Sequence, residues 1–184
     1  FLNLGHKWSG TFFENDQSIV KPFTYEQTIE VARDVISRLK GIANGRIGTM
    51  LAFPYLCGLN PDYMAGNHLH TYSSEDAKQL RDKAIEARGI ADEFMVPIHT
   101  HGAKGVFEWA EQHYGMETLR EVLGGPVIFA HSNGLTDRDI SIMKENGSTA
   151  SAVPFGAWNT TLGTCPIVKL IQNDVGVAMG LGVT

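Results

Sequence analysis

The chain has 184 residues, and its 20 acidic and 15 basic residues give a formal net charge of −5. The basic residues are scattered, which argues against the basic patch or stripe of a nucleic-acid-binding surface. No apolar run approaches the roughly 20 residues that a membrane-spanning helix requires. Two cysteines far apart in the sequence do not make a disulfide framework. We therefore expect a cytoplasmic globular protein with neither nucleic acid nor membrane as a partner.

Apolar runs alternate with stretches of helical periodicity along the chain. Thr24 with Gln27, and Thr136 with Asp139, have the spacing of a helix capping box. Helices are expected at 24–40, from Ser73 or Ser74 to about 94, at 105–122 with a break near Gly115, from Thr136 to Asn146-Gly147, and at 165–172. Strands are expected at 47–53, 95–100, 126–131, 148–153 and 175–181.

This alternation predicts an α/β fold with a parallel sheet and crossover helices. The strands are continuous apolar runs, which is typical of a sheet covered by helices. A doubly wound sheet and a TIM barrel both fit, although the sequence has no GxGxxG or P-loop to favour the nucleotide-binding form. Five strands do not close an eight-stranded barrel. The prediction is therefore part of a (β/α)8 TIM-like barrel, roughly strands four to eight with their helices.

Histidines stand where two of the predicted strands end. His131 follows the apolar run 127–130, and His99 and His101 follow the run 96–98. Neutral imidazole is the commonest metal ligand, and the active site of a barrel lies at the C-terminal ends of its strands. His99 and His101 share one side of an extended strand, so both reach one ion, or one binds it while the other holds substrate. Alternatively, each histidine taken alone could be a core residue whose polar atoms are hydrogen-bonded within the protein.

Several motifs, taken in order, resemble the amidohydrolase superfamily, in the branch of guanine and adenosine-type deaminases and triazine hydrolases. Residues 97–103 resemble its fifth-strand motif, and residues 128–136 resemble its sixth-strand motif. Weaker likenesses to the seventh and eighth strands follow at Val153-Pro154, Asn159, Leu162-Gly163, Pro166-Ile167 and 176–180. The resemblance implies that residues 1–184 are a portion of a single metal-dependent hydrolase barrel domain. Because the sequence opens on Phe1 and stops directly after an apolar run, both ends are expected to be truncated.

The resemblance implies roles for individual residues. His131 matches the sixth-strand metal ligand, which is a catalytic position. The fifth-strand ligand is His101 if the segment is aligned with His-Thr-His-Leu-Ala-Glu, and His99 if it is aligned with members having a single histidine after the apolar run; the first alignment is preferred. The family's His-x-His at strand one and its strand-eight aspartate match no position in this sequence.

The residue expected to move protons differs from that of the deaminases. They carry a glutamate three residues after the fifth-strand histidine, where this sequence has Lys104 if His101 is the ligand, or Gly102 if His99 is. Neither replaces a carboxylate as a general base, although Lys104 could donate a proton or hold a carboxylate. Lys104 is therefore the second catalytic candidate, and deamination becomes the second choice of reaction.

Four further residues are candidates for contact with substrate. Asn133 follows the predicted strand at 126–131, and His70 lies in the loop that follows the first predicted strand. Trp158 and Asn159 lie after the strand at 148–153. Each could instead be a surface or packing residue of a loop. Other polar residues in the helical stretches, among them His113, Asp137 and Asp139, are expected to belong to solvated helix faces or helix caps.

The leading hypothesis is a metal-dependent hydrolase that uses a metal-activated water on a C–N or related bond of a small-molecule substrate. The expected cofactor is one divalent ion, Zn²⁺ first, with Fe²⁺ or Mn²⁺ as alternatives. A deaminase of a nucleobase-like heterocycle is one alternative. A non-catalytic barrel fragment that binds a ligand or partner, and a doubly wound sheet with an unrelated site, are two others. A half-barrel leaves strand edges unpaired, so the expected partner is a second copy or the rest of the same polypeptide.

Overall fold

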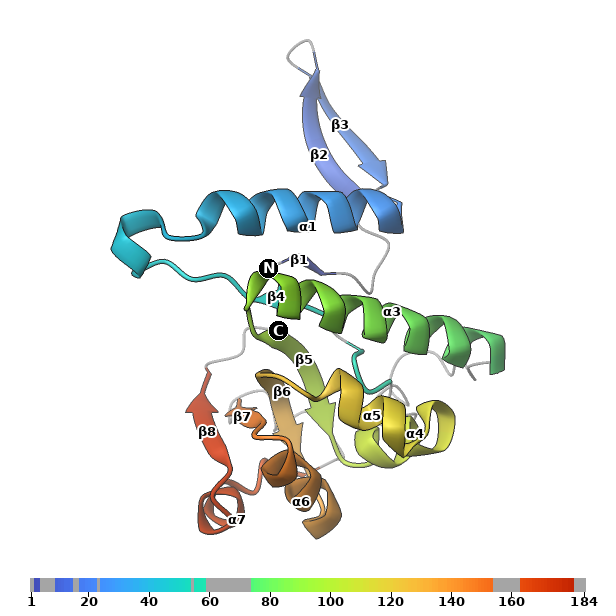
Figure 1. Cartoon of the computed structure of the whole chain (residues 1–184), viewed down its shortest axis with the longest axis vertical. Helices are drawn as coiled ribbons and strands as arrows, with labels where there is room; N and C mark the ends of the chain where they lie inside the picture. Colours follow the sequence, from blue (N-terminus) through green and yellow to red (C-terminus); the bar gives the residue numbers. More distant parts are fainter. Residues whose placement is uncertain are drawn as a thin grey trace.

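The computed structural model describes residues 2–3, 9–14, 17–22, 24–53, 55–58, 74–153 and 163–180. Within these residues, six parallel strands form one sheet in the order β1-β4-β5-β6-β7-β8, and two antiparallel strands, β2 and β3, form a hairpin (Figure 1). The bounds of the six are Leu2–Asn3 (β1), Leu51–Ala52 (β4), Ile98–Ala103 (β5), Val127–Asn133 (β6), Thr149–Ala152 (β7) and Gly176–Met179 (β8).

The strands lie in the sheet in the same order as in the chain, and all pair in parallel. A doubly wound sheet reverses its strand order at a switch point, and this sheet has no reversal among its described strands. Helices follow most strands and return the chain for the next one (Figure 1). The predicted α/β class is therefore confirmed, and the strand order favours the barrel over the doubly wound alternative.

The predicted helices are all present. Their bounds are Tyr25–Leu39 (α1), Ser74–Phe94 (α3), Val106–Tyr114 (α4), Met116–Val122 (α5), Asp137–Glu145 (α6) and Ile167–Gln172 (α7), with a 3-10 turn η1 at Ile42–Gly45. Thr24 and Thr136 each close the predicted capping box. Gly115 has a φ of 82° between α4 and α5, a conformation that costs glycine little and other residues more. This glycine explains why the helical stretch breaks where the sequence predicted.

The main core lies between the sheet and the helices. Alternate residues of β5 and β6, namely Ile98, Thr100, Val127 and Phe129, are buried. Phe129 contacts the ring of Phe107 from α4 edge to face, with centroids 5.1 Å apart. The residues between them in sequence lie on the opposite face of the sheet, because side chains alternate along a strand. This opposite face is where His99 and His101 lie.

The structure differs from the sequence prediction mainly before Thr24 and at the strand ends. The short β1 and the hairpin of β2 (Ser9–Glu14) and β3 (Gln17–Pro22) were not predicted, and the hairpin projects away from the sheet (Figure 1). β4 is shorter than the predicted 47–53, because only Leu51 and Ala52 pair with β5. β5 and β6 extend past their predicted ends, so His101, which was expected just after a strand, lies within β5, and His131 lies two residues before the end of β6.

The sequence also predicted that the two cysteines form no disulfide and that no helix spans a membrane. Cys57 and Cys165 are both free thiols, as the sequence suggested, and burial raises the pKa of the Cys165 thiol to about 11. Among the residues that the structure describes, no helix has both the length and the apolar character needed to cross a membrane.

Asp139 is a buried carboxylate that joins two loops at the sheet edge where β5 and β6 end. Its Oδ2 accepts hydrogen bonds from the backbone N–H and the hydroxyl of Thr136, at 2.7 and 2.8 Å. It also accepts a hydrogen bond from the backbone of Gly105, in the loop between β5 and α4. Burial, the largest influence, raises the pKa of the Asp139 carboxyl. The side chain therefore caps α6, as predicted, and also ties the neighbouring loop to it.

We predict that Asp139→Ala lowers the free energy of unfolding by about 1–2 kcal/mol, the range for loss of a helix cap. Asp139→Asn should cost less, because an amide oxygen still accepts the Thr136 hydrogen bonds and carries no charge to bury. Denaturant unfolding measures both effects. Asp137→Ala is the control, since Asp137 is an exposed neighbour on the same helix turn. Equal losses from Asp139→Ala and Asp137→Ala would contradict this account.

Candidate functional site

Two histidine rings lie side by side where β5 and β6 end. The ring centroids of His101 and His131 are 5.2 Å apart, with an angle of 66° between the ring planes. Both side chains are partly buried. The parallel pairing of β5 with β6 places them there, because it sets His101 opposite Ala130 and Gly102 opposite His131. The structure thus brings together two of the three histidines that the sequence singled out.

His131 reaches this position through an irregular backbone. Simple alternation from the buried Phe129 would turn His131 toward the helices. The pairing of β5 and β6 shifts after Gly102, so that Ala103 lies opposite Asn133 and Ser132 is left over as a bulge. His131 and Ser132 have φ values of 67° and 52°. A bulge redirects side chains, and left-handed backbone at non-glycine residues is concentrated at functional sites.

Gly102 allows the two strands to pair in this way. A Cβ atom built on Gly102 would lie 2.8 Å from the Cβ of Phe129, closer than real side chains approach. Any larger residue would push β6 away from β5 next to both histidines. The glycine that follows His101 in the sequence is therefore a packing requirement of the histidine pair.

His99 lies on the same face of β5 as His101, as the sequence predicted, since the residues on either side of each are buried. Burial lowers the pKa of His99, and the nearby His131 lowers it further. Burial also lowers the pKa of His131. Both imidazoles are thus held in the neutral form, the form that binds metal ions. In the described part of the chain, no three His, Cys, Asp or Glu side chains are close enough together to share one ion.

Tyr55 is a member of the site that the sequence reasoning missed. It lies in the loop after β4, and its ring centroid is 6.2 Å from that of His101, with the rings nearly perpendicular at 81°. The signal available in the sequence was its place directly after a predicted strand, because loops at the C-terminal strand ends of a barrel surround the active site.

Lys104 and Asn133 lie next to each other beyond the histidine pair. The backbone N–H of Lys104 donates to the carbonyl oxygen of Asn133 at 2.9 Å. Lys104 is exposed, whereas Asn133 is 1% exposed. Among the described residues, none donates a hydrogen bond to the buried Asn133 Oδ1 atom. The loop between β5 and α4 thus presents a lysine at the edge of the site, while Asn133 is enclosed behind it.

The remaining candidates separate into two groups. His70, Trp158 and Asn159 lie outside the described residues. His113 belongs to the last turn of α4 and lies against the Trp109 ring, with centroids 4.3 Å apart. Its position agrees with the structural role expected from the sequence.

No family model matches the chain. It is 26% identical over 166 residues to a 5'-deoxyadenosine deaminase of Methanococcus maripaludis, covering 84% of this chain and 34% of that protein. It is 27% identical over 165 residues to a 5-methylthioadenosine/S-adenosylhomocysteine deaminase of Syntrophomonas wolfei, covering 84% of this chain and 33% of that protein. The chain spans about a third of the length of these curated relatives.

Solved structures share the fold. Guanine deaminase from C. acetobutylicum with bound guanine matches with a TM-score of 0.58 and 16% identity, over 88% of this chain and 36% of that one. A mutant atrazine chlorohydrolase from Arthrobacter aurescens, complexed with zinc and atraton, matches with a TM-score of 0.56 and 15% identity, over 84% and 31%. These neighbours are TIM barrels, which confirms the predicted fold. The sequence relatives confirm the predicted resemblance: the chain is similar to adenosine-type deaminases, and it shares its fold with guanine deaminase and triazine hydrolase, all of the amidohydrolase superfamily.

Proposed function

We propose that this chain carries part of the active site of a metal-dependent hydrolase acting on a C–N or related bond of a small molecule. The observation that carries the proposal is the pair of imidazoles of His101 and His131, 5.2 Å apart at the C-terminal ends of neighbouring barrel strands. Two neutral imidazoles converging on one side of a sheet edge can share an ion between them. The relatives, which are deaminases and chlorohydrolases, support the same class of reaction.

The chemistry of the donors fits a divalent ion, with Zn²⁺ as the first choice. Neutral imidazole is a preferred zinc ligand, and burial lowers the pKa of His131 in the direction that keeps it neutral. His101 and His131 are the proposed ligands from this chain. His99 is the weaker candidate, because the preferred alignment matches His101 to the fifth-strand ligand, although His99 lies on the same face of β5. Further ligands would come from residues outside the described ranges, and Fe²⁺ or Mn²⁺ are alternative metals.

A bound ion would supply an activated water and would polarise the scissile group. The residues of this chain would orient it and complete the site. Gly102 keeps β5 and β6 close enough for the two imidazoles to converge. Lys104, whose backbone is fixed to Asn133, would place an ammonium group at the edge of the site, where it could donate a proton to a leaving amine or bind an anionic substrate group. His70, Asn133, Trp158 and Asn159 remain candidates for substrate contact.

Deamination of an adenosine-type substrate is the second candidate. Both curated relatives described above are named as deaminases of adenosine derivatives. The residue that argues against it is Lys104, which occupies the position where the deaminases resembled by this sequence carry a glutamate. A lysine does not accept a proton from water as a carboxylate does, so hydrolysis without that carboxylate is the first choice.

We predict that His131→Ala lowers zinc affinity by at least about 100-fold, since even an outer-shell partner of a ligand can contribute 10–100-fold. Elemental analysis and competition with a chelator measure the affinity of the purified protein. His113→Gln is the matched control, because His113 lies on α4 against Trp109. The proposal is wrong if His131→Ala retains both its zinc and its turnover.

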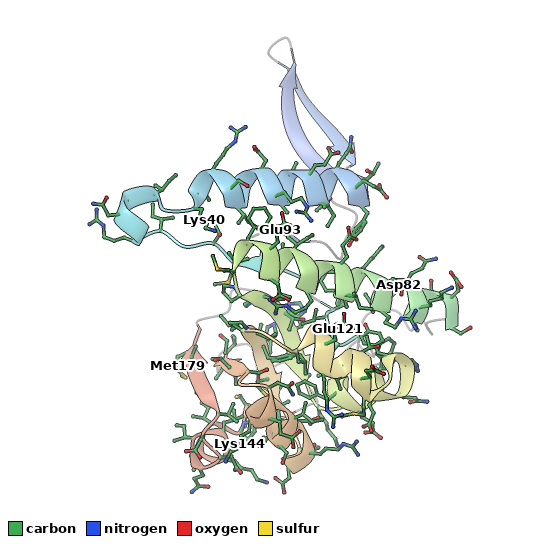
Figure 2. All side chains as sticks on the ribbon, viewed as in Figure 1. Lys40, Asp82, Glu93, Glu121, Lys144 and Met179 are labelled. Carbon is green, nitrogen blue, oxygen red and sulfur yellow. The ribbon has the colours of Figure 1, made fainter. Side chains whose placement is uncertain are left out.

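Lys104→Gln should lower kcat by about 100-fold, the lower part of the range for loss of a positioned proton donor, with zinc content unchanged. Ammonia release from 5'-deoxyadenosine and hydrolysis of a chlorotriazine are the two assays. Lys40→Gln is the control, since Lys40 lies at the C-terminal end of α1, far from the ends of β5 and β6 in Figure 2. Equal turnover by the two variants would remove Lys104 from the mechanism.

The metal-free protein should lose stability as the pH falls. Burial lowers the pKa of His131, and burial together with His131 lowers the pKa of His99. Unfolded histidine titrates near 6.5, so the unfolded chain binds protons at a pH where both folded imidazoles are still neutral. Their contribution to stability is therefore complete above about pH 6.5 and is lost as the pH falls toward the folded pKa values.

Denaturant unfolding in the presence of a chelator, at about pH 7.5 and about pH 5.5, measures this effect. His99→Gln should show a smaller difference between the two pH values than the unsubstituted protein. An unchanged difference would mean that other groups cause the pH dependence.

A further inference from the structure

We propose that Tyr55 is a specificity-determining residue of the histidine site, and that its ring selects substrates with a planar aromatic ring over substrates with a saturated ring. The inference rests on the proposed function, because it assigns a substrate class to the same site. It depends on three observations: the place of Tyr55 beside the histidine pair, the way its loop is held, and its partial exposure.

Tyr55 extends the histidine pair into a row of three rings. The Phe53 backbone N–H donates to the His99 carbonyl oxygen at 2.9 Å, which continues the pairing of β4 with β5 up to the edge of the site. Two residues later, the Tyr55 ring meets His101 edge to face. His101 in turn meets His131. A small molecule bound over the two imidazoles would therefore have the Tyr55 ring as its neighbour on the β4 side.

Hydrogen bonds and burial hold the residues that directly follow Tyr55. The Leu56 backbone N–H donates to the buried Thr100 Oγ1 at 3.2 Å, and the Gly58 N–H donates to the Tyr55 carbonyl oxygen at 2.9 Å. Leu56 and the next residue, Cys57, are almost completely buried. The backbone of Tyr55 is thus tied to β5, the strand that carries His101.

Gly58 closes this turn against α4. Its φ is 81°, and a Cβ built there would lie 1.9 Å from the ring of Trp109. Only glycine satisfies both the backbone angle and the contact. The backbone of Tyr55 is therefore fixed in advance of binding, and preorganisation of this kind lowers the entropic cost of a contact with a ligand.

Tyr55 is only partly buried, so the residue is not enclosed in the core. Aromatic rings prefer offset or edge-to-face contact with other planar rings, beyond the effect of buried area. A contact of this kind changes binding by about threefold to tenfold. A saturated ring of equal size lacks the π-electron quadrupole that produces this preference. The aromatic ring of Tyr55, and not its hydroxyl, is the selective element.

Benzamide and cyclohexanecarboxamide test this, since they share a neutral amide and a six-membered ring and differ in aromaticity. Dissociation constants are measured by NMR titration with the zinc-loaded protein and with Tyr55→Phe, Tyr55→Leu and, as a control distant from the site, Tyr25→Leu. Tyr25 lies at the start of α1 and donates to Glu86 of α3. The zinc content of each protein is determined alongside.

The expected result is a preference for benzamide of about threefold to tenfold in the unsubstituted protein. Tyr55→Phe and Tyr25→Leu should keep this preference, and Tyr55→Leu should abolish it at full zinc content. No preference in the unsubstituted protein, or a preference that survives in Tyr55→Leu, overturns the inference. Loss of zinc in Tyr55→Leu also overturns it, because the ring would then act by supporting His101. The proposed function is tested separately, by measuring the zinc affinity and the turnover of His131→Ala.

Discussion

The pairing of β5 with β6 is the constraint on which the site depends. Regular alternation along β6 would turn His131 into the helix layer, behind Phe129. The bulge at Ser132 and the left-handed backbone of His131 instead bring its ring to within 5.2 Å of His101. A left-handed conformation at a non-glycine residue costs on the order of 1–2 kcal/mol. The surrounding sheet and helices must hold this strained segment in place.

The buried side of the sheet provides that support. Phe129 is fully buried against α4, and Gly102 lets it approach β5. Just beyond, Asp139 ties the loop after β5 to the start of α6. Contacts on the helix side therefore fix the geometry on the opposite face, where the histidines lie. Such an arrangement is typical of a barrel, in which residues that pack against the helices alternate with site residues along the same strands.

The candidate site extends over three neighbouring strands and their loops. The loop after β4 contributes Tyr55, β5 contributes His101, the loop after β5 contributes Lys104, and β6 contributes His131. Backbone N–H groups anchor the two loops: Leu56, next to Tyr55, donates to Thr100 of β5, and Lys104 donates to Asn133 of β6. A site assembled in this way would combine rigid positioning of the imidazoles with loops that are free to vary in composition. Barrels of the same fold bind molecules as different as guanine and atraton.

The sequence by itself determined the helices, the parallel α/β class and the two histidine-bearing strands, because capping boxes, apolar periodicity and motif order are local signals. Thr24, Thr136 and Gly115 set helix limits in the way their chemistry requires. Only the tertiary structure decided which histidines meet, because strand register and the bulge at Ser132 depend on contacts between segments distant in sequence. The same holds for Tyr55, whose approach to His101 depends on the pairing of β4 with β5 and on the packing of Gly58 against Trp109.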